Sequence, residues 1–241
     1  MAKYDQKYCE DEITTFLNEN DLWRLYKQSF IKTGHGSYNS SKYYADFLMK
    51  NGYVNKFAKI TPVERENEYL ILDHLNRTFK QTKKGTWTEK NSIKKIVKEK
   101  SYIKELGVPF DFQIPLKNVS KEENKKYSDY GEIDLLVDSK RGTIYMVEAK
   151  RIDTEKDTAL SAIIEIVTYY YQLGKDGRNK ILKEAAEKYK CNAKKIKMAV
   201  LFFLRSKPAK DIKNSELKNV LELAKKLDVK IVIANPNELG F

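Results

Sequence analysis

Apolar residues recur at helical intervals over the first quarter of the chain, as at Ile13 and Leu17. A break rich in glycine, serine and asparagine follows at residues 34–41, and a second short helix is expected at residues 42–50. We therefore expect a helical N-terminal region over residues 1–58. Two helices around a tight break are typical of a cap on a larger core. They are also compatible with a small DNA-recognition element.

A capped helix is expected at the start of the remaining chain, residues 59–241. Thr61 can cap a helix N-terminus, Pro62 suits its first position, and Glu64 can return a hydrogen bond to the cap. Apolar residues at helical spacing then follow, so the pattern predicts a helix over residues 61–79.

From residue 110 onward the apolar positions alternate or form continuous runs, as they do in strands. Five strands are expected, at residues 110–116, 131–137, 143–149, 198–204 and 229–234. Further helices are expected at residues 92–100, 157–173, 179–189 and 215–227. The element order from residue 61 is α-β-β-β-α-β, followed by another α-β. This order predicts an α/β fold in which helices flank a mixed central sheet.

The charge of the chain indicates a polyanionic partner. Its formal net charge is +12 and its pI about 9.3, and residues 83–104 alone hold eight lysines and two glutamates. Such a surplus is typical of proteins that bind nucleic acid or an anionic membrane, although well-solvated surfaces can also account for it. No run approaches the ~18 apolar residues of a membrane span. We therefore expect DNA as the partner, with RNA as an alternative, and no membrane.

Cysteine and histidine are too sparse for the usual metal or disulfide frameworks. The two cysteines, Cys9 and Cys191, form no CxxC pair, and this usage fits a reducing cytoplasm. No apolar signal core follows the polar N-terminus. His35 and His74 have no metal-ligand partner at useful spacing. We expect a cytoplasmic protein without histidine-based chemistry.

Three charged residues interrupt two otherwise apolar strands. Glu148 and Lys150 are two residues apart, so they share one face of a strand. If a hairpin pairs the two strands, Asp134 can join them on that face. Burying unpaired charge costs several kcal/mol. Carboxylates beside a lysine at such positions therefore need a metal ion or a reason of comparable weight.

Two carboxylates suit Mg²⁺, a hard ion that keeps an octahedral oxygen shell, and Mn²⁺ is expected to substitute for it. Such an ion polarises a phosphodiester and lowers the pKa of a bound water. We expect Asp134, Glu148 and the Ala149 carbonyl as ligands. Lys150 would orient the attacking water and offset charge in the transition state.

Asp134, a 13-residue gap, and then Glu148-Ala149-Lys150 resemble the motif of the PD-(D/E)xK nuclease superfamily. The predicted α-β-β-β-α-β order resembles the restriction-endonuclease-like core of that superfamily over residues 61–205. One departure is Ile133, which stands where the superfamily name places proline. The resemblance implies that residues 59–241 form the nuclease core. It also implies a further glutamate on the first core helix, for which Glu68 is the best counterpart.

The resemblance implies a Mg²⁺-dependent deoxyribonuclease, and a restriction-type endonuclease is the preferred subclass. Cleavage of both strands would favour a homodimer. The alternative is a catalytically silent nucleic-acid-binding protein that keeps the fold.

Several neighbouring residues have simpler explanations than catalysis. Glu132 could be a further ligand, but a residue in this position more often caps the strand or pairs with a lysine. Glu165 and Gln172 on the following helix could approach the site, although structural or solvent-facing roles suffice. The tyrosines at residues 169–171 could stack on bases, yet an aromatic helix face packed on the sheet accounts for them.

Overall fold

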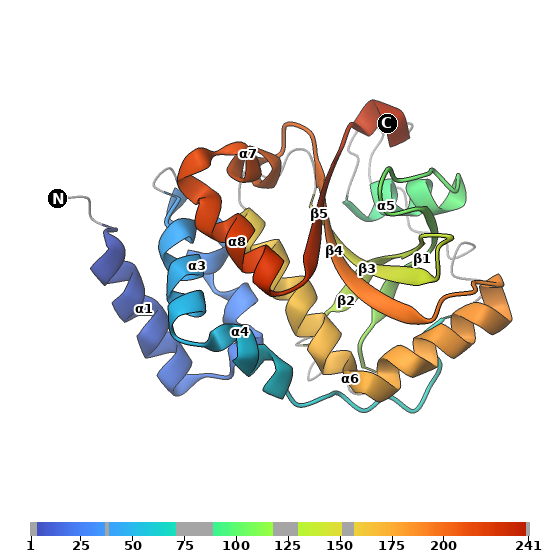
Figure 1. The fold of residues 1–241 in the computed structure, drawn as a ribbon, viewed down its shortest axis with the longest axis horizontal. Coiled ribbons are helices and arrows are strands. Elements are labelled where there is room, and N and C mark those ends of the chain that lie inside the picture. Colours follow the sequence, from blue (N-terminus) through green and yellow to red (C-terminus); the bar gives the residue numbers. More distant parts are fainter. Residues whose placement is uncertain (1–3, 37–38, 71–88, 118–129, 151–156, 240–241) are drawn as a thin grey trace.

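A computed structural model describes residues 4–36, 39–70, 89–117, 130–150 and 157–239, and within them five strands form one sheet in chain order (Figure 1). The strands are β1 (Val108–Pro115), β2 (Glu132–Asp138), β3 (Thr143–Lys150), β4 (Lys195–Phe203) and β5 (Val229–Ala234). β1, β2 and β3 pair antiparallel, whereas β3, β4 and β5 pair parallel. The expected α/β fold with a mixed sheet is confirmed, and each predicted strand overlaps an observed one.

Helices lie on both faces of this sheet and fill the N-terminal region. The α-helices are α1 (Gln6–Glu19), α2 (Ser29–Thr33), α3 (Ser41–Lys50), α4 (Tyr53–Lys56), α5 (Glu89–Lys98), α6 (Ala159–Tyr189), α7 (Lys207–Lys213) and α8 (Lys218–Lys226). Short 3₁₀ helices are η1 (Leu22–Lys27), η3 (Phe57–Lys59), η5 (Ser215–Leu217) and η6 (Pro236–Leu239). The pattern missed α7, which the Ser206 side chain caps at the Ala209 N–H.

Alternation along β3 sorts its side chains between two cores. Ile144 and Met146 pack with α6, whereas Val147 and Ala149 pack with α5 on the opposite face. By the same alternation, the charged residues at the end of β3 lie on the α6 face. β4 is buried on both faces, as its continuous apolar run predicts.

α6 joins two helices that the sequence pattern separates. The two expected helices leave a break between residues 173 and 179, and the backbone of Gly174 within it is non-helical (φ 61°, ψ −176°). The helix nevertheless continues beyond this kink to Tyr189. Its N-terminus is capped by Thr158, whose side chain accepts the Ser161 N–H.

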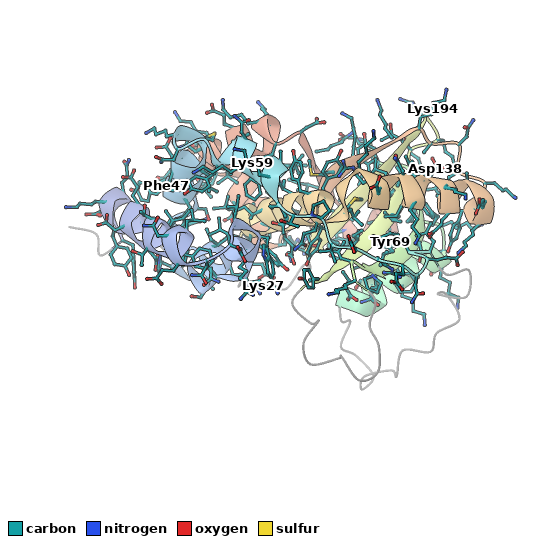
Figure 2. All side chains as sticks on the ribbon, turned by 90° about the horizontal axis from the view of Figure 1, so that it is seen from below. Lys27, Phe47, Lys59, Tyr69, Asp138 and Lys194 are labelled. Carbon is teal, nitrogen blue, oxygen red and sulfur yellow. The ribbon has the colours of Figure 1, made fainter. Side chains whose placement is uncertain are left out.

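The helix predicted from residue 61 is wrong over residues 61–70, which have no helical structure, and residues 71–79 lie outside the described ranges. We call residues 61–70 the strap. The strap begins just after Lys59, on the helical half of the molecule, and reaches Tyr69 beside the sheet half (Figure 2). The Val63 N–H donates to the Gln172 carbonyl at 2.7 Å, and Pro62 lies against Gly174. The kinked helix thus offers hydrogen-bond partners that a local capping pattern cannot anticipate.

The far end of the strap is held by a buried carboxylate. Oε2 of Glu184 on α6 accepts the N–H groups of Tyr69 and Leu70, both at 2.8 Å. The strap is therefore fixed to α6 on both sides of the kink.

The N-terminal helices share the core of the α6 face of the sheet. Cys9 and Leu48 belong to the same buried cluster as Ile163 and Val200. The Thr158 N–H and hydroxyl donate to carbonyls of residues 32 and 31, at 2.8 and 2.7 Å. Among the described helices, none has the length and apolar character required to cross a membrane, the 31-residue α6 included.

Candidate active site

The structure brings Asp134, Glu148 and Lys150 together at the ends of β2 and β3. Lys150 Nζ lies 2.6 Å from Glu148 Oε1. The Asp134 carboxylate accepts the Ala149 N–H at 2.8 Å. All three charged residues are buried, with exposed fractions of 8%, 3% and 8%.

Two residues of α6 complete this group. Glu165 Oε2 accepts from Lys150 Nζ at 2.8 Å, and the Tyr169 hydroxyl donates to Glu165 Oε1 at 2.8 Å. We call Asp134, Glu148, Lys150, Glu165 and Tyr169 the ionisable cluster. Glu165 was expected either to approach the site or to have a structural or solvent-facing role, and it contacts Lys150.

Asp134 takes the place of a backbone partner where the two strands separate. Regular pairing of β2 with β3 begins at Leu135 opposite Val147. Beyond that point the Asp134 side chain, rather than a backbone carbonyl, accepts the N–H of Ala149. This contact fixes the carboxylate at the strand end, beside the backbone that the sequence predicts as a ligand.

Negative charge is most crowded at Glu148. Burial raises the pKa of Glu148 well above its usual value, and the charges of Asp134 and Glu165 raise it further. Burial alone would lower the pKa of Lys150, but the neighbouring carboxylates outweigh it and raise that pKa. Burial would raise the pKa of Glu165, yet its contact with Lys150 lowers it. The two carboxylates thus favour the charged form of Lys150, and the charged form of Glu148 is the one that an added cation would stabilise most.

Gly131 permits the close approach of Tyr169 to this site. A Cβ at position 131 would lie 2.3 Å from the Tyr169 hydroxyl, and the glycine has a φ of +75°. An L-residue is therefore disfavoured here by both its backbone and its side chain. The Tyr169 hydroxyl also lies 3.5 Å from that of Tyr26, which η1 contributes from the N-terminal region.

The donor set fits the expected ion. In the described part of the chain, no three His, Cys, Asp or Glu side chains already form a metal-binding group. Mg²⁺ does not require one, because it usually keeps several waters and takes one or two carboxylates from the protein. Asp134 and Glu148, with the Ala149 carbonyl beside them, supply hard oxygen donors of that kind.

Glu68 is not part of the cluster. Its side chain lies in the strap, is 65% exposed and pairs with Lys188 Nζ at 2.5 Å. This contact lowers the pKa of Glu68. Lys188 follows Glu165 by 23 residues on α6, roughly 30 Å along the helix. Glu165, from the helix after the motif, supplies the additional carboxylate instead.

The other candidates have structural partners. Gln113 Nε2 donates to Glu132 at 3.1 Å, and His35 lies 2.8 Å from Glu12 in the N-terminal region. Tyr170 and Tyr171 pack against the core, as an aromatic helix face would. His74 lies outside the described residues.

The fold and the cluster define an α/β protein with a buried group of carboxylates and a lysine at adjacent strand ends. Comparison of the chain with protein-family models, curated proteins and solved structures finds no match.

Proposed function

We propose that this protein is a Mg²⁺-dependent nuclease that hydrolyses phosphodiester bonds of DNA. The observation that carries the proposal is the convergence of Asp134, Glu148 and Lys150 at the adjoining ends of β2 and β3. The spacing of these residues resembles the PD-(D/E)xK motif, and their geometry agrees with the roles expected from it.

Each residue of the site has a defined task in this reaction. Asp134 and Glu148, with the Ala149 carbonyl, would hold the ion. The ion, when bound, supplies a Lewis acid that polarises the phosphodiester and favours proton loss from water. Lys150 orients the attacking water and offsets charge at the phosphate. Glu165 is a positioning residue, since it holds the lysine by a charge-assisted hydrogen bond.

The substrate class follows from charge. A net charge of +12 favours association with a polyanion, and DNA is the proposed substrate. A restriction-type endonuclease is the subclass we favour, with the helical N-terminal region supplying contacts to DNA. A homodimer would allow both strands to be cut.

The test compares Asp134→Asn with Asp138→Asn. Both residues are buried carboxylates of β2, but Asp138 lies at the far end of the strand. Purified variants are incubated with linear, supercoiled and branched DNA, and with RNA, in Mg²⁺ or Mn²⁺. Binding of Mn²⁺ is measured in parallel by calorimetry.

We expect Asp134→Asn to abolish cleavage and to weaken Mn²⁺ binding, whereas Asp138→Asn retains both. Absence of cleavage of every substrate by the unmodified chain would contradict the nuclease proposal. If the unmodified chain binds DNA but neither cuts it nor binds Mn²⁺, the protein is a silent nucleic-acid-binding module.

A further inference from the structure

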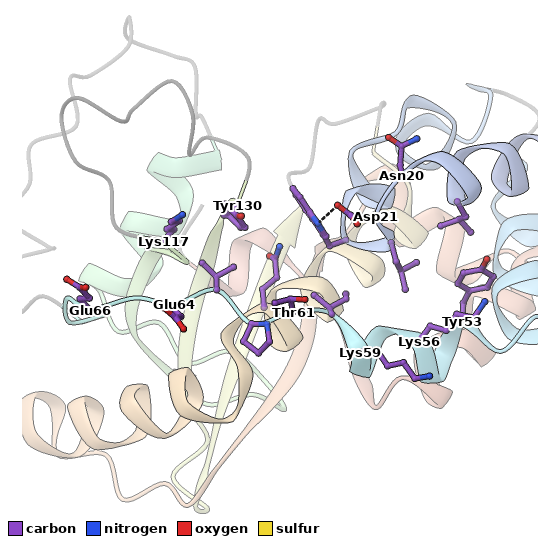
Figure 3. Close-up of a pocket in the computed structure, with 17 residues that line it drawn as sticks. Asn20, Asp21, Tyr53, Lys56, Lys59, Thr61, Glu64, Glu66, Lys117 and Tyr130 are labelled. Carbon is purple, nitrogen blue, oxygen red and sulfur yellow. Dashed lines mark hydrogen bonds between the residues drawn. The ribbon is translucent and has the colours of Figure 1, made fainter.

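A cleft of about 790 Å³ lies between the helical N-terminal region and the strap (Figure 3). Trp23 of η1, Tyr53 of α4 and Tyr130 before β2 bring aromatic rings to it. Its volume falls within the range typical of small-molecule sites. The proposed catalytic residues do not line this cleft, so it is a separate feature of the molecule.

The cleft nevertheless adjoins the ionisable cluster. Trp23 shares η1 with Tyr26, whose hydroxyl lies 3.5 Å from that of Tyr169. Gln172 lines the cleft from α6, two helical turns after Glu165, which is about 10 Å along the axis. A nucleotide in the cleft would therefore lie within a few nucleotides of a bond held at the cluster.

The wall of the cleft presents a stacking platform. The rings of Trp23 and Tyr130 stack with centroids 5.6 Å apart and an interplanar angle of 11°. Two cations lie over the Trp23 ring: the Arg24 guanidinium at 4.7 Å and Lys27 Nζ at 5.5 Å from its centroid. Neither residue lines the cleft. A base that stacks on Trp23 would displace these cations from the ring, and they would then lie near its phosphate.

Gln172 gives the cleft a buried polar group. Its side chain is 2% exposed, and its Oε1 atom has no hydrogen-bond partner among the described residues. Buried amide oxygens are nearly always hydrogen-bonded in folded proteins. The atom is enclosed in this conformation, so a ligand N–H or O–H donor would bond to it after the Gln172 side chain turns toward the cleft.

Charge in the cleft is balanced rather than basic. Three lysines and three carboxylates line it: Lys56, Lys59, Lys117, Asp21, Glu64 and Glu66. A surface built only to hold phosphates would carry an excess of lysine or arginine. Base stacking and hydrogen bonding therefore account for the lining better than phosphate binding alone.

We propose that this cleft binds an unpaired nucleotide of the substrate strand, with its base against Trp23 and its polar edge on Gln172. The inference rests on the proposed nuclease function and names its substrate class as nucleic acid with a single-stranded segment. It therefore favours a branched structure or a strand end as the substrate over the intact duplex of a restriction-type endonuclease. Bases within a duplex are stacked on their neighbours, whereas those of a single strand are available to an aromatic ring.

The test uses binding rather than cleavage. The chain has two tryptophans, so Trp87→Phe leaves Trp23 as the only indole. This protein is titrated, in Ca²⁺ to prevent cleavage, with an oligothymidylate of about twelve nucleotides. Trp23 emission is recorded, and the same strand annealed to its complement serves as the comparison. Anisotropy of a labelled oligonucleotide then compares Trp23→Ala, Trp23→Phe, Gln172→Leu and the control Tyr102→Ala, whose ring is 64% exposed outside the cleft.

We expect the single strand, but not the duplex, to quench Trp23. Trp23→Ala should weaken binding roughly five- to a hundredfold, which corresponds to the loss of one stacked base. The dependence of binding on salt should hardly change, because no phosphate contact is removed. Trp23→Phe should retain much of the affinity, Gln172→Leu should weaken binding, and Tyr102→Ala should leave it unchanged.

Equal quenching by duplex and single strand would overturn the inference. So would unchanged affinity in both Trp23→Ala and Gln172→Leu. Quenching without cleavage in Mg²⁺ would refute the nuclease proposal and support nucleotide binding in the cleft. Cleavage without quenching would support the nuclease proposal and refute nucleotide binding in the cleft.

Discussion

Replacing Gly131 with alanine should displace Tyr169, the residue that holds Glu165 in the candidate site. The new methyl group would lie 2.3 Å from the Tyr169 hydroxyl, so the tyrosine must move. Its hydrogen bond to Glu165 would then be lost. Gly142 provides a matched control, because its φ is +79° and a Cβ there would meet nothing within 4 Å.

The expected magnitude has two parts. An alanine in the left-handed region costs about 1–2 kcal/mol, and both variants carry that cost. A hydrogen bond to a charged group contributes about 1.5–3 kcal/mol, and only Gly131→Ala loses one. In urea unfolding with a slope of about 3 kcal/mol/M, the midpoint for Gly131→Ala should lie about 0.5–1 M below that for Gly142→Ala.

Tyr169→Phe tests whether the hydroxyl is the cause. In the Tyr169→Phe background, Gly131→Ala should lower the free energy of unfolding by less than it does in the unmodified chain. Part of the effect should remain, because ring carbons would still lie 2.7 and 2.8 Å from the methyl group. A double-mutant cycle measures this coupling. Equal midpoints for the two glycine variants, or zero coupling with Tyr169→Phe, would refute the reasoning.

Three further perturbations test the hydrogen bonds and charges of the structure. Lys150→Met removes the cation from between two buried carboxylates and should destabilise the fold by roughly 3–5 kcal/mol in urea unfolding; a loss below about 1 kcal/mol would contradict the observed ion pairs. Burial of Asp138 would raise its pKa, but the hydrogen bonds that it accepts from Lys140 outweigh burial and lower it. The ionised Asp138 therefore stabilises the folded state above pH ~4, and this stabilisation is lost as the pH falls through the lowered pKa. Unfolding midpoints of Asp138→Asn should accordingly vary less with pH below ~4 than those of the unmodified chain, and parallel curves would exclude this contribution. Glu184→Ala leaves two buried N–H groups without their acceptor and should speed hydrogen exchange at residues 69 and 70, whereas unchanged protection would show that Glu184 does not hold the strap.

The strands and the central charged residues were predictable because their signals are local. β3 is an apolar run that ends in Glu148 and Lys150, and alternation alone places both on one face. The helix expected at residues 92–100 overlaps α5, and the apolar residues at helical spacing in it, Ile93, Ile96 and Val97, are all buried.

The strap was not predictable from the chain alone. The residues at Thr61 fit a helix cap, but the backbone of residues 61–70 instead donates hydrogen bonds to α6, which lies more than a hundred residues away in the sequence. The assignment of Glu68 failed with the helix on which it depended. Glu165 was named as a residue that could approach the site, but a structural role ranked above it. The polar stripe of Glu165, Tyr169 and Gln172 at helical spacing on an otherwise apolar helix was a signal in its favour.

The shared core of the N-terminal helices and α6 has a consequence for biosynthesis. The hydrogen bond from the Thr158 hydroxyl to the Ile31 carbonyl spans 127 residues. At ribosomal rates of about 5–20 residues per second, the first helices emerge roughly 6–25 s before the helix that buries them. The apolar faces of those helices lack this partner throughout that interval. The region that contributes Tyr26 next to the candidate site is thus synthesised before the helix whose core it shares.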